Sequence, residues 1–180
     1  MKILVFSCSL NPDSSSYALA KQVVNDLAAA GPGVETTLID LREHTMPLCD
    51  GQTCTNRSVA ELTDLVQSAD AILLAAPIYN YDVNAAAKNL VEHTGSAWEN
   101  KVVGFLAAAG GHGSYMSLMP LANSLMLDFR CLVIPRFVYA TGSDFTGDRV
   151  TSPKILTRIA QLATETVRLA RALAQPVSAA

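Results

Sequence analysis

Short, uninterrupted apolar runs alternate with longer stretches of helical periodicity along this chain of 180 residues. The runs cover residues 3–6, 37–39, 71–76, 102–108 and 131–134. Strands that are buried on both faces, as in a parallel sheet covered by helices, have this pattern. Because neighbouring parallel strands need a crossover connection, usually a helix, the alternation predicts an α/β fold. We expect a doubly wound, five-stranded parallel sheet in the order 2-1-3-4-5, with helices on both faces.

Five helices are predicted between and after these runs. The first has an apolar stripe at every fourth residue from Leu19 to Leu27 and ends at Gly31-Pro32-Gly33. Ser58 and Glu61 have the spacing of a capping box, which predicts the start of the second helix. The others are expected at residues 83–93, 116–128 and 152–174. We therefore predict a single domain, residues 1–175, followed by a frayed tail, residues 176–180.

The composition excludes several classes of protein. Hydrophobic residues make up 50% of the chain and charged residues 16%, which excludes a disordered protein. The net charge is −3 and like charges do not cluster, so we expect no nucleic-acid partner. No apolar stretch reaches the roughly 18–20 residues of a membrane span, so we expect no membrane partner. Four cysteines at irregular spacing predict neither a disulfide framework nor a metal site, and a reduced, cytoplasmic protein is expected.

The segment after the first run is rich in hydroxyl side chains. In a doubly wound sheet, ligands bind beyond the carboxyl ends of the strands, beside the first strand. The start of the following helix offers free N–H groups and a positive dipole end, so a phosphate can bind there without lysine or arginine. Neither a Gly-x-Gly-x-x-Gly nor a Gly-Lys-Ser/Thr motif occurs here, which favours a single phosphate monoester. The candidate residues are Ser9, Asn11, Ser14, Ser15 and Ser16.

Two further segments are predicted to end at the same edge of the sheet. Pro77, Ile78, Tyr79, Asn80 and Tyr81 follow the third run, and they offer rings and hydrogen-bonding groups to a flat heteroaromatic ligand. A proline turn with core tyrosines is the alternative interpretation. After the fourth run, glycines allow close approach of the backbone to a ligand, although a plain turn would also contain them. The candidate residues there are Gly110, Gly111, His112 and Gly113, with His112 either near the ligand or in solvent.

Together, these three loops resemble those of the NADPH-dependent FMN reductases. The matching residues are Ser9, Leu10 and Ser14 in the first loop, Pro77, Tyr79, Asn80, Lys88 and Asn89 in the second, and Gly110, Gly111 and Gly113 in the third. The resemblance covers residues 1 to about 135. The chain departs from the family's pattern at Cys8, Asn11, Ile78 and Asn84-Ala85. At residue 11 the family has an arginine, so its charged contact to the phosphate is absent.

This resemblance implies a flavodoxin-like fold and a bound FMN. It further implies an FMN-dependent oxidoreductase that takes electrons from NADPH or NADH and passes them to a flavin, a quinone or a similar small acceptor. The chemistry would then take place on FMN, with no catalytic side chain. A flavodoxin-like electron carrier without enzymatic activity is the alternative, although its usual Thr-rich phosphate loop is absent. A cofactor-free binding module on the same fold is the third hypothesis.

The predicted third and fourth helices carry more apolar or small residues than one buried stripe requires. Residues 85–87 and 116–127 show this excess. Extra apolar surface on a folded protein usually contacts a partner, and the related reductases are oligomers, so we expect a homodimer or homotetramer. Trp98 could close the site or fill the core, and the long irregular segment 44–57 is expected to cover a neighbouring surface.

Overall fold

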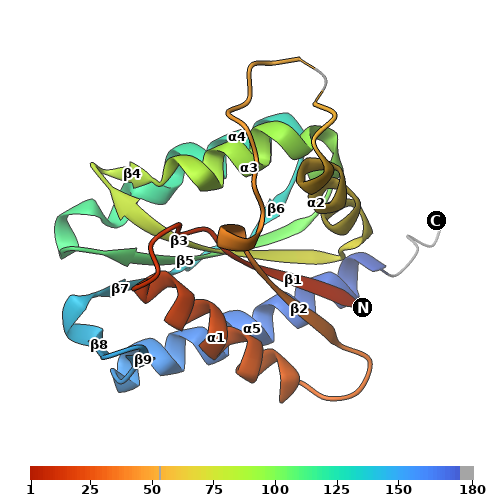
Figure 1. The fold of residues 1–180 in the computed structure, drawn as a ribbon. Coiled ribbons are helices and arrows are strands. Elements are labelled where there is room, and N and C mark those ends of the chain that lie inside the picture. Colours follow the sequence, from red (N-terminus) through yellow and green to blue (C-terminus); the bar gives the residue numbers. More distant parts are fainter. Residues whose placement is uncertain (53, 175–180) are drawn as a thin grey trace.

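The computed structural model describes residues 1–52 and 54–174 and contains a mostly parallel sheet between two layers of helices (Figure 1). The strand order β2-β1-β3-β5-β6, with β7 also paired to β5, confirms the predicted doubly wound sheet. These pairs are all parallel, so the strands end at one carboxyl edge. The strands are β1 (Lys2–Ser7), β2 (Glu35–Asp40), β3 (Ala71–Tyr79), β5 (Val102–Ala109), β6 (Leu132–Val133) and β7 (Val138–Thr141).

Helices cover both faces of this sheet. One face packs against α1 (Ser15–Ala28) and α5 (Pro153–Ala174), and the other against α2 (Arg57–Ser68), α3 (Ala85–Thr94) and α4 (Met119–Phe129) (Figure 1). Successive side chains of a strand point to opposite faces, so Val5 joins the first apolar core and Phe6 the second. Both are fully buried, which explains why the strands are continuous apolar runs in the sequence.

The fifth position of the sheet differs from the prediction. The run at residues 131–134 forms only the short strand β6, and the chain resumes as β7 beside β5. Pro135 has no N–H to donate to a ladder, and Arg136 has a φ of 75°, outside the range of a strand. Two short strands separated by this break therefore occupy the position of one.

The predicted helix ends also differ from the observed ones. Asn56, not Ser58, is the N-cap of α2, because its side-chain oxygen accepts a hydrogen bond from the Val59 N–H at 3.2 Å. The first helix ends at Ala28, before Gly31, which has a φ of 99°. The start of the predicted fourth helix belongs to a 3-10 helix. The remaining short elements are β4 (Asp82–Val83), β8 (Phe145–Thr146), β9 (Arg149–Val150), η1 (Leu41–Glu43), η2 (Gly95–Trp98), η3 (His112–Leu118) and η4 (Gly142–Asp144).

No helix within residues 1–52 and 54–174 has the length and apolar character needed to cross a bilayer. The predicted domain end at residue 175 and the predicted tail, residues 176–180, lie outside the described residues.

Candidate functional site

A cleft of about 280 Å³, here called the rim cleft, opens at the carboxyl edge of the sheet where β1, β3, β5 and β7 end. The residues that line it are Ser9, Asn11, Asp13, Ser14, Ser15, Pro77, Ile78, Tyr79, Ala108, Ala109, Gly110, Gly142 and Phe145. All three predicted loops therefore contribute to one cleft. The predicted residues that do not line it are Ser16, Asn80, Tyr81, Gly111, His112 and Gly113.

The loop after β1 is held by its own short side chains. The Ser9 hydroxyl accepts a hydrogen bond from the Asn11 N–H at 3.2 Å, and the Asn11 side chain accepts one from the Asp13 N–H at 3.0 Å. Ser14 is the N-cap of α1, and its hydroxyl accepts from the Tyr17 N–H at 3.2 Å. The first N–H groups of a helix have no partner inside the helix. This arrangement leaves the amino end of α1 available to an anion at the rim cleft.

Ser16 contacts this loop through the hydroxyl of Ser14. It is buried, and its hydroxyl lies 2.9 Å from that of Ser14. Ser16 therefore positions the N-cap residue without lining the cleft itself.

Arg42, which was not predicted from the sequence, supports the same loop from η1, directly after β2. Its guanidinium donates to the Pro12 carbonyl at 3.2 Å and lies 4.8 Å from the centre of the Tyr17 ring. Its Nε also donates to the Asp40 carboxylate at 2.9 Å. Burial opposes ionisation of Asp40, but the hydrogen bonds and charge of Arg42 outweigh it and lower the pKa of that carboxyl. Because Asp40 neutralises Arg42, we assign Arg42 to the support of the loop.

A tight hairpin follows β3. Asn80 and Tyr81 have φ values of 51° and 65°, as in the two-residue turns that join antiparallel strands, and β3 pairs here with β4. The side chains of Tyr79 and Tyr81 are 52% and 72% exposed, so they are not core tyrosines. Tyr79 lines the rim cleft, whereas the Tyr81 hydroxyl lies 3.5 Å from where a Cβ on Gly113 would stand. The hairpin thus brings the second and third loops together.

Asn84 joins the first loop to the second. Its buried side-chain amide donates a hydrogen bond to the Cys8 carbonyl at 2.7 Å, and its backbone N–H donates one to the Pro77 carbonyl at 3.1 Å. In the sequence it stood out only as a departure from the family's pattern. Burial raises the pKa of the neighbouring Cys8 thiol, which disfavours the reactive thiolate.

The glycine loop after β5 is held by Tyr139 of β7. The buried Tyr139 hydroxyl donates to the Gly111 carbonyl at 2.5 Å and lies 2.7 Å from the Ser114 hydroxyl. Gly110 lines the rim cleft, and a Cβ on Gly110 or Gly111 would meet no atom within 4 Å. The space above the loop is therefore open.

Gly142 and Phe145 line the cleft from a fourth segment that the sequence analysis missed. They follow β7, which was not predicted because the fifth strand was placed at residues 131–134. The apolar run 137–140, followed by Thr-Gly-Ser-Asp, was the signal that could have located them.

Residues 47 and 49, in the long segment before α2, contact α3. The path of this segment toward α3 is visible in Figure 1. The Asn89 side chain accepts a hydrogen bond from the Cys49 N–H at 2.9 Å and donates to the Pro47 carbonyl at 2.8 Å. His93 lies 2.8 Å from the same carbonyl oxygen. Asn89, which matched the family's second motif, thus anchors this segment, while Lys88 pairs with Glu92 at 3.4 Å.

A doubly wound sheet with a serine-rich loop between β1 and α1, and with aromatic residues after β3, is typical of the flavodoxin-like fold. Solved structures agree with this class. An oxidoreductase from Corynebacterium diphtheriae superposes with a TM-score of 0.78 and 21% identity, covering 95% of this chain and 97% of the other. FerB from Paracoccus denitrificans, a flavoenzyme NAD(P)H:(acceptor) oxidoreductase, gives a TM-score of 0.75 and 21% identity with the same coverage.

The chain belongs to the NADPH-dependent FMN reductase family, which matches residues 1–146. It is 30% identical over 173 residues to an NAD(P)H-dependent FAD/FMN reductase of Geobacillus thermodenitrificans, covering 94% of this chain and 93% of the relative. It is 27% identical over 165 residues to an FMN reductase (NADPH) of Pseudomonas aeruginosa, covering 88% and 86%. The predicted class, an FMN-dependent NAD(P)H oxidoreductase, is confirmed over the electron-carrier alternative.

Proposed function

We propose that the rim cleft is the FMN site of this oxidoreductase. The phosphate would lie at the amino end of α1, on Ser9, Ser14 and the neighbouring backbone amides, with Ser16 holding Ser14 in place. The hairpin at residues 77–81 would hold one edge and one face of the ring, and the loop at residues 110–113 would flank the other side. The convergence of these three loops on one cleft is the observation that supports this proposal.

The residues of the rim cleft fit a phosphate ester without a cationic side chain. Among the described residues that line it, Asp13 is the one charged residue, so the anion depends on hydroxyl groups, backbone N–H groups and the helix dipole. The open space above Gly110 and Gly111 allows a flat ring to approach the backbone closely.

FMN, when bound, accepts electrons from a nicotinamide and passes them to the acceptor. The protein's own residues orient and expose the site. Pro77 and Ile78 are buried, whereas Tyr79 is half exposed, and all three line the cleft. We propose that donor and acceptor use the open side of this cleft in turn, because one face must stay free for close stacking.

Steady-state kinetics test this use of a single site. With NADPH or NADH varied against a quinone or free flavin, we expect parallel double-reciprocal lines, because the nicotinamide leaves before the acceptor enters. Tyr79→Ala should lower turnover with every acceptor by about twofold to tenfold, the range of a lost aromatic contact. Cys54→Ser is the control and should change at most the acceptor preference. Intersecting lines for the wild-type protein would contradict shared use of the cleft.

We also propose that the protein is a homodimer or homotetramer. Several large apolar side chains of η3 and α4 are exposed, and Leu127 is exposed by 75%. The others are Met116, Met119 and Met126. Such a patch on a folded chain favours association. Light scattering should give a multiple of 19.1 kDa at micromolar concentration, and Leu127→Glu should shift the mass toward the monomer. A wild-type mass near 19.1 kDa would contradict the proposal.

We propose that the protein is cytoplasmic because its cysteine thiols are free. All four cysteines are free, with Cys8 and Cys131 buried and Cys49 and Cys54 partly exposed. Free, partly exposed thiols persist in reducing compartments, which supports this location.

A further inference from the structure

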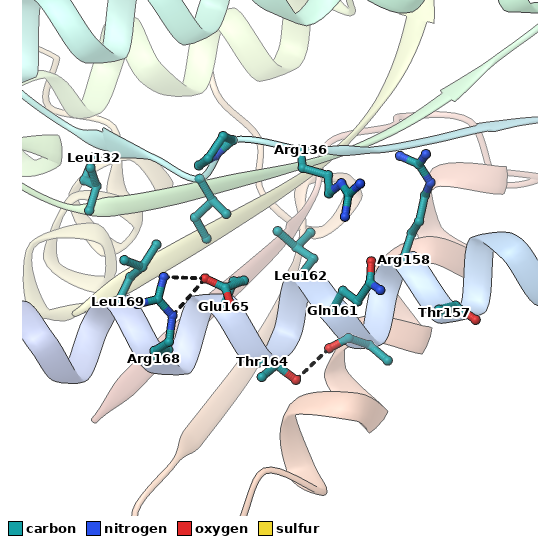
Figure 2. Close-up of a pocket in the computed structure, with 13 residues that line it drawn as sticks. Leu132, Arg136, Thr157, Arg158, Gln161, Leu162, Thr164, Glu165, Arg168 and Leu169 are labelled. Carbon is teal, nitrogen blue, oxygen red and sulfur yellow. Dashed lines mark hydrogen bonds and ion pairs between the residues drawn. The ribbon is translucent and has the colours of Figure 1, made fainter.

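A second hollow, here called the arginine groove, lies between α5 and the break that separates β6 from β7 (Figure 2). Its volume is about 700 Å³, within the range of small-molecule sites. It shares no lining residue with the rim cleft. The break at Pro135 and Arg136 ends the ladder of β6 and leaves this edge of the sheet uncovered above α5.

The floor of the groove is apolar. Leu132 and Ile134 approach it from the sheet, and Leu162 and Leu169 from α5. The lining residues of α5 run from Thr157 to Leu169, a helical length of about 18 Å at about 1.5 Å per residue. The groove is therefore long and apolar enough for an extended hydrocarbon chain.

The charges of the groove are unequal at its two ends. Arg168 is neutralised by Glu165, with a hydrogen bond of 2.7 Å. Among the described residues, neither Arg136 nor Arg158 has a carboxylate within ion-pair distance. Figure 2 shows Arg136 reaching from the sheet edge toward Arg158 on α5, away from Arg168 and Glu165. The positive charges of these two arginines attract an anion to the groove, although the chain as a whole has a net charge of −3.

We propose that the arginine groove binds a free medium-chain fatty acid. The carboxylate lies between Arg136 and Arg158, where guanidinium groups offer paired hydrogen-bond donors. The hydrocarbon chain lies along Leu162 toward Leu169. A small inorganic anion would leave the apolar floor empty, and an uncharged chain would leave the two arginines unpaired. A carboxylate with one hydrocarbon chain would cover the apolar floor and pair with the two arginines.

Calorimetric titration of the FMN-loaded protein with dodecanoate tests the proposal. We expect saturable binding that weakens at least tenfold in the double variant Arg136→Gln/Arg158→Gln. Arg171→Gln is the matched control, because Arg171 is exposed on the same helix but does not line the groove. Octanoate should bind at least tenfold more weakly than dodecanoate, since each buried CH₂ contributes about fourfold. Dodecanol should bind more weakly and respond little to the double variant.

A second variant tests the location without altering charge. Ala160 is exposed and lines the groove, so Ala160→Trp should fill it and abolish dodecanoate binding. Unaltered binding to Ala160→Trp, or equal weakening by Arg171→Gln and the arginine pair, would overturn the proposal. The absence of saturable binding to the wild-type protein would also overturn it. If a second copy of the chain covers the groove, Ala160→Trp should in addition reduce the mass measured by light scattering.

Discussion

Ser14→Asp is expected to abolish retention of FMN while leaving the fold intact. Aspartate is as good an N-cap as serine, so the cap of α1 and its hydrogen bond to the Tyr17 N–H should persist. The new carboxylate would face the proposed phosphate. Two unit charges about 4 Å apart repel by about 4 kcal/mol at an effective dielectric constant of about 20, so we expect FMN affinity to fall at least about 100-fold. The flavin-to-protein ratio after gel filtration measures this.

Asn56→Asp provides a matched control for this charge. Asn56 caps α2 in the same way that Ser14 caps α1, but it does not line the rim cleft. This variant should purify with the wild-type flavin ratio, and both variants, compared without flavin, should unfold within a few degrees of the flavin-free wild type. If Ser14→Asp keeps its full flavin content, the phosphate lies elsewhere.

The sheet could be predicted because its physical signal is local. A strand segment that is buried on both faces is a continuous apolar run, as residues 3–6 of β1 and 71–78 of β3 are, and this pattern is visible in the sequence without knowledge of the neighbouring strands. Parallel pairing then places the ends of all the strands at one edge. For this reason, loops that are far apart in the sequence could be predicted to meet at the rim cleft.

The supporting contacts of the site could not be predicted, because each depends on a distant partner. Asn84 and Cys8 are 76 residues apart, and Arg42 and Pro12 are 30 apart. Neither pair has a sequence motif, since an asparagine or an arginine near a loop has many possible partners. Phe145 was missed for a different reason, since Pro135 and Arg136 divide the fifth strand and hide its second half.

Trp98→Ala is expected to destabilise the protein strongly without changing the rim cleft. The Trp98 ring is fully buried, with its centre 6.4 Å from that of Phe6. Its Nε1 donates to the Thr94 hydroxyl at 2.6 Å. The indole therefore fills the core and is not part of the site. Removing a buried aromatic ring costs about 3–5 kcal/mol of unfolding free energy, and this corresponds to a melting temperature about 6–20 °C lower. Thermal unfolding followed by circular dichroism measures the change.

Trp98→Phe separates the two contributions of the indole. Phenylalanine keeps most of the apolar contact but leaves the Thr94 hydroxyl without its donor, although that hydroxyl still donates to the Leu90 carbonyl at 2.7 Å. The loss should therefore be smaller than with alanine. Because Trp98 does not line the rim cleft, both variants should keep the wild-type flavin ratio in their folded fraction. Loss of flavin from a Trp98→Phe variant with wild-type stability would instead place the indole in the site, since a residue that only fills the core affects binding through the folded population alone.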